Sequence, residues 1–178
     1  MAASDPALPP PLARAFARFR AALDEPGWER APSDPARPAS AAGTGDDDDV
    51  VVFRPPGRHA RCWCVLSFDA RADAVVARAL LPLPCPPERL AATAELCMRV
   101  NRRLAFGRLE LDPDTRDVGF QLAWPACMVG ASIVPLVELF VTLLERHVPA
   151  IIMVMEAGVA PTLALAGIEA SASRLAWQ

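Results

Sequence analysis

A histidine and two cysteines have residue types that could bind a metal. His59, Cys62 and Cys64 form the pattern H-x2-C-x-C, and imidazole nitrogen and thiolate sulfur are ligands that zinc prefers. A structural zinc site needs four ligands, and the remaining cysteines are distant in the sequence. Strand alternation also places both thiols on the core side, so we interpret them as buried cysteines and expect no metal site.

Two other pairs have the residue types of catalysis. Cys97 and His147 could act as a nucleophile and its base, although the nearest acid to the histidine in sequence, Glu145, is predicted on the polar face of its helix and His147 on the apolar face. Glu110 and Asp112 would share one face of a strand, as an acid–base pair could. Arg108 beside them favours a solvated sheet face instead, and His147 is better explained as a cap at a helix C-terminus. We therefore expect no catalytic residue and no cofactor.

Composition narrows the class of protein further. The 178 residues carry a net charge of -3 and are 53% hydrophobic, which fits one packed domain and argues against nucleic acid as a partner. Five cysteines without a disulfide spacing or a secretory signal indicate a reducing compartment. We expect a cytoplasmic protein if the source is bacterial, with a plastid as the alternative if it is algal or plant. The consecutive acids 46–49 lack the spaced ligands of a calcium loop and indicate a solvated loop.

Two segments raise the question of membranes. Residues 118–137 contain no charged side chain, but Pro125, Gly130 and Pro135 interrupt them, so we expect no transmembrane segment. Near the start, arginines flank two phenylalanines, which is a weaker pattern for contact with a membrane surface. These residues are Arg14, Phe16, Arg18, Phe19 and Arg20.

The hydrophobic periods predict an α+β domain in which an antiparallel sheet of about five strands carries helices on one face. The predicted order is α-β-β-β-α-β-β-α-α, within a single domain over 11–178 that follows a disordered 1–10 and contains a flexible Pro/Ala/Asp-rich loop at 29–49. Pro149 is expected to end the long helix and begin a shorter one. Helices are predicted over 11–23, 87–104, 133–148, 150–157 and 161–170, and strands over 50–53, 61–68, 74–81, 106–112 and 118–124.

The segment from Leu96 to Trp124 carries a specific pattern. A helix ends in Val-Asn-Arg-Arg at 100–103, and the run Phe-Gly-Arg-Leu-Glu-Leu-Asp-Pro-Asp follows at 106–114. In these motifs the chain resembles the YbjN family, whose fold is similar to that of type III secretion chaperones. The resemblance implies a sensory or regulatory role and brings no catalytic motif. The loop at 29–49 departs from the family pattern and is expected to leave the first helix loosely tied.

Apolar residues beyond those needed for one core stripe, and a group of arginines, are candidates for contact with a partner. Val134, Val137 and Val141 widen the apolar face of the long helix, which marks either a deeper core or an interface. Arginines near the end of the second helix form a basic patch that could bind an acidic partner. The patch comprises Arg99, Arg102, Arg103 and Arg108. The candidate partner-binding residues are Val134, Val137, Val141, Arg99 and Arg103.

Together these patterns predict a non-enzymatic protein-binding module with a chaperone-like or regulatory role. It would act by forming a homodimer or by holding a segment of a partner protein. The alternative is a small-ligand-binding protein or a small enzyme with a pocket lined by Trp63, Trp124 and Met128.

Overall fold

The computed structural model describes residues 9–24, 28–30, 50–56, 62–130 and 132–175. Of the segment 1–10 that was predicted to be disordered, residues 1–8 lie outside these ranges, and Pro10 is the first residue of a helix. Most of the predicted loop at 29–49 also lies outside them.

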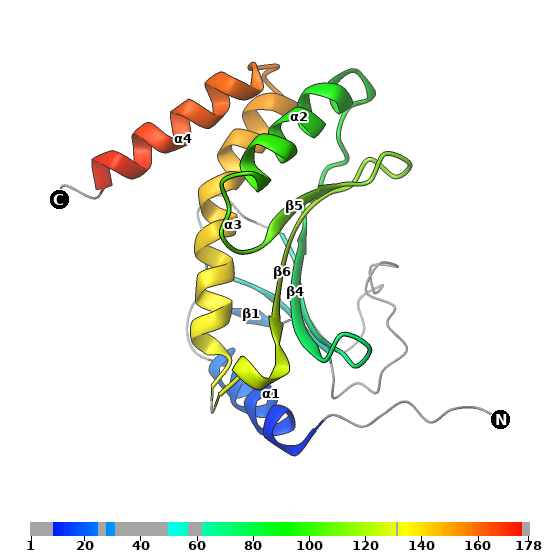
Figure 1. Ribbon diagram of the computed structural model, residues 1–178, viewed down its shortest axis with the longest axis vertical. Coiled ribbons are helices and arrows are strands. Elements are labelled where there is room, and N and C mark those ends of the chain that lie inside the picture. Colours follow the sequence, from blue (N-terminus) through cyan, green and yellow to red (C-terminus); the bar gives the residue numbers. More distant parts are fainter. Residues whose placement is uncertain (1–8, 25–27, 31–49, 57–61, 131, 176–178) are drawn as a thin grey trace.

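The strands form one antiparallel sheet in the order β1-β2-β3-β4-β6-β5. Helices α1 and α3 lie on one side of it (Figure 1). The strands are β1 (Glu29–Arg30), β2 (Val50–Arg54), β3 (Cys64–Asp69), β4 (Ala74–Leu80), β5 (Arg108–Leu111) and β6 (Val118–Pro125). The helices are α1 (Pro10–Ala22), α2 (Leu90–Asn101), α3 (Val134–Met155) and α4 (Pro161–Leu175), with short 3-10 helices η3 (Pro87–Arg89) and η4 (Ala126–Met128). The predicted α+β class with an antiparallel sheet is confirmed, and β1 adds a short strand that the sequence pattern had not indicated.

Alternation along the strands decides which side chains enter the core. In a strand, successive side chains point to opposite faces, and the register brings Leu66, Ala77 and Leu122 into one row on the helix side. All three are fully or almost fully buried. Two residues further along the same strands, Cys64 and Ala79 are cross-strand neighbours on this side and are equally buried. The predicted inward faces of these strands are therefore confirmed.

Helix α1 is tied to the sheet by three aromatic rings. The ring of Phe19 lies 5.2 Å from that of Phe53 and 6.1 Å from that of Trp28, in edge-to-face contacts. Such pairs contribute about 0.5–1.5 kcal/mol each beyond the apolar area they bury. The expectation of a loosely tied first helix was wrong for this reason, and Glu29 and Arg30 form β1 where a flexible loop had been predicted.

Helix α3 runs without interruption through Pro149, contrary to the prediction that this residue ends it. Proline cannot donate the usual hydrogen bond to Glu145 and costs about 3 kcal/mol inside a helix. The buried stripe nevertheless continues past it, because Ile151 and Val154 are as buried as Phe140 before it. Burial of each such side chain contributes about 1.5–3 kcal/mol, which offsets the cost of the proline.

Helix α2 lies between α3, α4 and strand β5. Its buried positions are Thr93, Leu96, Cys97 and Val100, whereas the predicted stripe was Leu90, Ala94, Cys97, Asn101 and Leu104. The buried face of α2 is therefore rotated by about one residue relative to the predicted stripe, because β5, α3 and α4 all contact this helix. Helix α4 packs on α2 and α3 through its first turns, and its end projects away from the body (Figure 1).

Asn101 joins the end of α2 to the outer edge of the sheet. Its Oδ1 accepts a hydrogen bond from the Leu109 N–H at 2.7 Å, and its Nδ2 donates one to the Leu109 carbonyl at 2.9 Å. The side-chain amide thus takes the place of a neighbouring strand at this position of β5, which is an edge strand. An exposed edge would otherwise leave these two backbone groups without a protein partner.

Gly107 makes the approach to β5 sterically feasible. Its φ is +76°, a conformation that favours glycine, and an added Cβ would lie 2.7 Å from the Phe120 ring and 2.9 Å from the Gln121 carbonyl oxygen. Asn101 and Gly107, one from each sequence motif, therefore both stabilise the contact of β5 with α2 and β6.

Replacing Asn101 with Ala should lower the free energy of unfolding by about 1–3 kcal/mol, because two partly buried hydrogen bonds are lost. Asn101→Asp should cost at least as much, since a carboxylate would face the Leu109 carbonyl. Urea denaturation of the variants measures both changes. The neighbouring exposed Arg102→Ala is the control, and an Asn101→Ala value within about 0.5 kcal/mol of it would contradict the role of the amide.

Candidate functional site

The two residues of the candidate catalytic pair, Cys97 and His147, have surroundings that do not favour catalysis. Cys97 is almost fully buried, and burial raises the pKa of its thiol to about 11. His147 lies within α3 and its Nδ1 is 2.7 Å from the Leu143 carbonyl oxygen of the preceding turn. The predicted helix cap was wrong, because α3 continues past this residue. A thiol with a raised pKa is a poor nucleophile at neutral pH, so these two residues do not form an activated pair.

Cys62 and Cys64 are in the core as predicted, with exposures of 2% and 0%. The hydrogen bond between their side chains lowers the pKa of Cys62 and raises that of Cys64. His59 lies outside the described residues. Within the described ranges, no three His, Cys, Asp or Glu side chains come together in a way that could hold a metal ion.

The carboxylate of Glu110 on β5 and that of Asp112, directly after this strand, have structural partners. Arg108 Nε lies 2.6 Å from Glu110 Oε1. Asp112 Oδ1 accepts hydrogen bonds from the N–H groups of Asp114 and Thr115 at 2.8 and 3.1 Å, so it caps the turn before β6. These backbone bonds, first that of Thr115, lower the pKa of Asp112. The two carboxylates thus stabilise a solvated hairpin.

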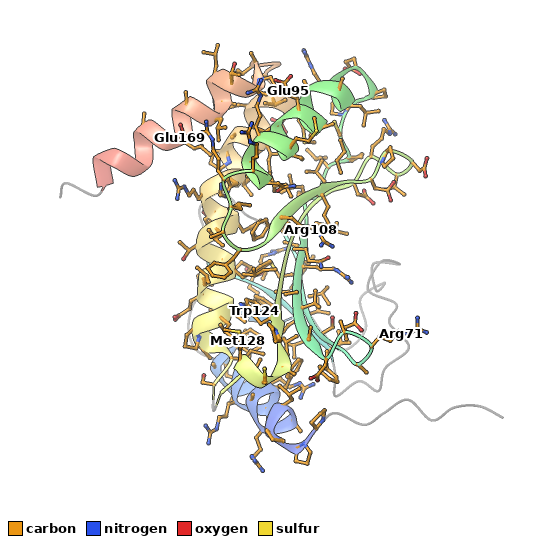
Figure 2. All side chains as sticks on the ribbon, viewed as in Figure 1. Arg71, Glu95, Arg108, Trp124, Met128 and Glu169 are labelled. Atoms are coloured by element: carbon orange, nitrogen blue, oxygen red, sulfur yellow. The ribbon has the colours of Figure 1, made fainter. Side chains whose placement is uncertain are left out.

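The predicted basic patch is largely neutralised by acidic side chains. Arg99 pairs with Glu95 at 2.7 Å on the same helix, and Arg103 pairs with Glu169 of α4. Arg108 belongs to β5 and lies apart from Glu95 and Glu169, below both of them in the view of Figure 2. Arg99 and Arg103 on α2 are therefore separate from Arg108 on β5, and the predicted patch is not one continuous surface.

The three residues of the alternative pocket do not come together. Trp124 faces the core from β6 with 5% exposure. Trp63 lies on the other side of the sheet, where the guanidinium of Arg54 is 4.4 Å from its ring centroid. Met128 is 65% exposed in η4, just after the strand that carries Trp124 (Figure 2). The predicted pocket was wrong because strand alternation sends the two tryptophans to opposite faces.

A small hollow of about 70 Å³ lies elsewhere, where α2, α3 and α4 meet. Apolar side chains and four polar ones, Arg103, Arg146, His147 and Glu169, line it. Pockets for drug-sized ligands have volumes of roughly 300–1,000 Å³. This hollow could therefore admit water or a small ion, but no molecule of that size.

The valines proposed for partner contact divide between core and surface. Val137 is completely buried, so it belongs to the core. Val134 and Val141 are half-buried and pack against the same core. Sequence periodicity could not separate these positions, because residues three or four apart in a helix differ in direction by only about 40–60°.

The second face of the sheet lies opposite α1 and α3, and we call it the open face. No described helix or strand covers it, and the sheet bends so that this face is concave (Figure 1). One row of cross-strand neighbours runs along it through Val52, Val65, Arg78, Gln121 and Arg108. A second row consists of Val50, Ser67, Val76 and Ala123.

The open face mixes aliphatic and polar side chains in these rows. Val52 and Val65 are half-buried, while Val76 and Gln121 lie deepest, with exposures of 5% and 9%. Arg78 stands exposed among them, and its Nε donates a hydrogen bond to Gln121 Oε1 at 2.9 Å. Such a surface offers non-covalent contacts and a positioned cation, which suits recognition of another molecule.

The sequence contained a signal for the open face that the interpretation above did not use. Strands with one wet face alternate apolar and polar residues, whereas strands buried on both faces read as continuous apolar runs. Residues 50–53 and 74–77 are continuous apolar runs of this kind. They indicate that the face opposite the helices also favours contact with apolar groups.

Comparison with known proteins matches this chain to a protein family. The family model of YbjN, described as "Putative bacterial sensory transduction regulator", matches residues 16–152. Searches among curated proteins and among solved structures found no match. The expected similarity to type III secretion chaperones therefore stays a prediction. None of the helices in the described ranges combines the length and apolar character needed to cross a bilayer.

The buried histidine should make stability depend on pH. Burial lowers the pKa of His147, so below about pH 6.5 the unfolded chain takes up a proton before the folded chain does. The free energy of unfolding should consequently fall as the pH drops through this range and level off below the lowered folded pKa. Urea denaturation between pH 8 and pH 5 measures the change, and His147→Gln should remove this component. An equal pH dependence in both proteins would contradict it.

Thiol labelling should distinguish the cysteines by burial. At pH 7.5 a thiol with a pKa of about 11 is ionised to roughly one part in three thousand. Iodoacetamide should therefore modify exposed Cys127 first and leave Cys97 intact in the folded chain, as peptide mass spectrometry would show. Labelling of Cys97 at a rate near that of Cys127 would contradict its burial. Labelling in urea, where all five thiols should react, is the control.

Proposed function

This chain belongs to the YbjN family, and from that membership and its open face we propose that it is a non-enzymatic regulator that acts by binding a protein partner. The regulatory part agrees with the description of the family. The binding part rests on one observation, the concave face of the sheet on which aliphatic side chains and an exposed arginine lie without a covering helix or strand among the described residues.

The placement of the ionisable groups supports binding over catalysis. A reacting centre normally needs an activated group in a cavity with partners that shift its pKa toward the working pH. Here the pKa of the candidate nucleophile Cys97 is shifted away from neutrality, and Glu110 is paired with Arg108. The hollow between the helices is also too small for most substrates.

A second surface could add to partner contact or to self-association. The outer part of α3 carries half-buried Val134 and Val141, and exposed Leu139 lies between them. Arg99 and Arg103 of α2 each hold an acidic residue of this chain, so a partner would have to compete with Glu95 and Glu169. For that reason we rank this surface below the open face.

A cytoplasmic setting in a bacterium, or a plastid, stays part of the proposal.

The proposal can be tested by capture with matched surface variants. The tagged full chain should retain a protein from a lysate of its native organism, and the purified pair should form a complex of defined mass by light scattering. Substituting Val52→Gln and Val65→Gln together should weaken the complex at least about tenfold, because apolar contact area is lost. Leu163→Gln on the exposed side of α4 is the control and should leave the affinity within about twofold.

A different outcome would overturn the proposed function. If no protein forms a defined complex with the chain, while a small molecule binds stoichiometrically and is converted, the chain is an enzyme. Circular dichroism and the urea midpoint of each variant establish that lost binding does not reflect unfolding.

A further inference from the structure

Arg78 occupies the centre of the open face. It lies on β4, which has β3 on one side and β6 on the other within the six strands. Its direct cross-strand neighbours are Val65 and Gln121. The cation therefore stands between an aliphatic side chain and an amide, in the middle of the row that continues to Val52 and Arg108.

The charge of Arg78 is unbalanced within the described part of the chain. The other two arginines of this face have carboxylate partners, since Arg54 lies 2.8 Å from Glu29 and Arg108 lies 2.6 Å from Glu110. Arg78 is held by the neutral oxygen of Gln121 instead, and none of the described acids forms an ion pair with it. Because Gln121 is almost buried, this bond fixes the guanidinium while leaving its terminal nitrogens available to an incoming acceptor.

The backbone of the sheet decides what kind of segment can lie on this face. The N–H and C=O groups of β4 are engaged with β3 and β6, so a bound segment meets side chains alone and must satisfy its own backbone groups. An α-helix does this internally, and its diameter of about 10 Å suits a concave surface. Helices already cover the other face in the same way, by packing an apolar stripe against the strands.

A second copy of this chain fits the open face less well. Two open faces packed together about a twofold axis near their centres would bring Arg78 of each copy close to the other. Two like charges without an intervening acid repel one another, and the repulsion is strongest where water is excluded. A partner of the opposite charge is favoured by the same reasoning.

We propose that the open face binds an amphipathic helix of a partner protein, whose apolar stripe carries a carboxylate that pairs with Arg78. The valines beside Arg78 receive the apolar residues of the stripe, and the guanidinium selects Asp or Glu among them. This inference rests on the proposed function and specifies the chemistry of the partner.

A displayed library of 18-residue helical peptides with an apolar stripe, randomised at its central stripe positions, tests the proposal. Selection on the full chain should enrich Asp or Glu at one of these positions. Changing the selected acid to its amide should weaken binding by about 10- to 100-fold in fluorescence anisotropy, because a charge-assisted hydrogen bond is lost. The Arg78→Gln chain should not distinguish the two peptides, and selection on Arg78→Glu should enrich Lys or Arg.

Control variants separate this effect from others. Arg14→Gln makes the same change of charge on exposed α1, behind the sheet, and should keep the preference for the acid. Arg78→Lys should keep part of the preference, since the charge remains. Circular dichroism and the urea midpoint confirm that the variants are folded.

Several outcomes would overturn the inference. One is the absence of acidic enrichment, including the absence of any binder, and another is an unchanged preference in Arg78→Gln. A dimer in light scattering that dissociates on Val65→Gln would assign the face to a second copy. A native partner whose affinity depends on Val52 and Val65 but not on Arg78 would leave the proposed function standing and reject only this inference.

Discussion

One constraint governs this molecule: a six-stranded antiparallel sheet has two faces, and the described helices cover one of them. Because strand side chains alternate, the register that turns Leu66, Ala77 and Leu122 toward α1 and α3 also turns Val65, Arg78 and Gln121 the other way. A slip by one residue would exchange these two sets and place a charged guanidinium in the core. The strand register therefore decides both which side chains stabilise the covered face and which side chains the open face presents to solvent.

Three local devices keep that arrangement in place. The aromatic contacts of Phe19 hold the first helix against the sheet, and continuous burial carries α3 through Pro149. At the far edge, the Asn101 amide satisfies the outer backbone groups of Leu109. An edge strand closed in this way is less available for pairing with another strand. At Leu109 the backbone is thus unavailable for pairing with a partner strand, which agrees with the proposed binding through side chains of the open face.

The candidate reacting groups illustrate how environment overrides residue type. Cysteine, histidine and paired carboxylates are common in active sites. Here Cys97 is buried with a raised thiol pKa, His147 contacts a carbonyl of its own helix, and Glu110 pairs with the adjacent Arg108. Arg78 differs from them because its described partner is a neutral amide. A fixed, exposed cation among aliphatic side chains favours recognition of a carboxylate, which is compatible with a regulatory family.

The sequence by itself determined the α+β class, the inward face of each longer strand and the hairpin at Asp112, because alternation and turn chemistry act over a few neighbouring residues. The motifs at 100–103 and 106–114 also carry the resemblance to the YbjN family, which the family match bears out. Only the tertiary structure decided that α3 passes through Pro149, that Asn101 binds Leu109, and that Trp63 and Trp124 lie on opposite faces. Each of these depends on contacts between segments distant in sequence, whose energies outweigh local preferences and leave no periodic pattern in the chain.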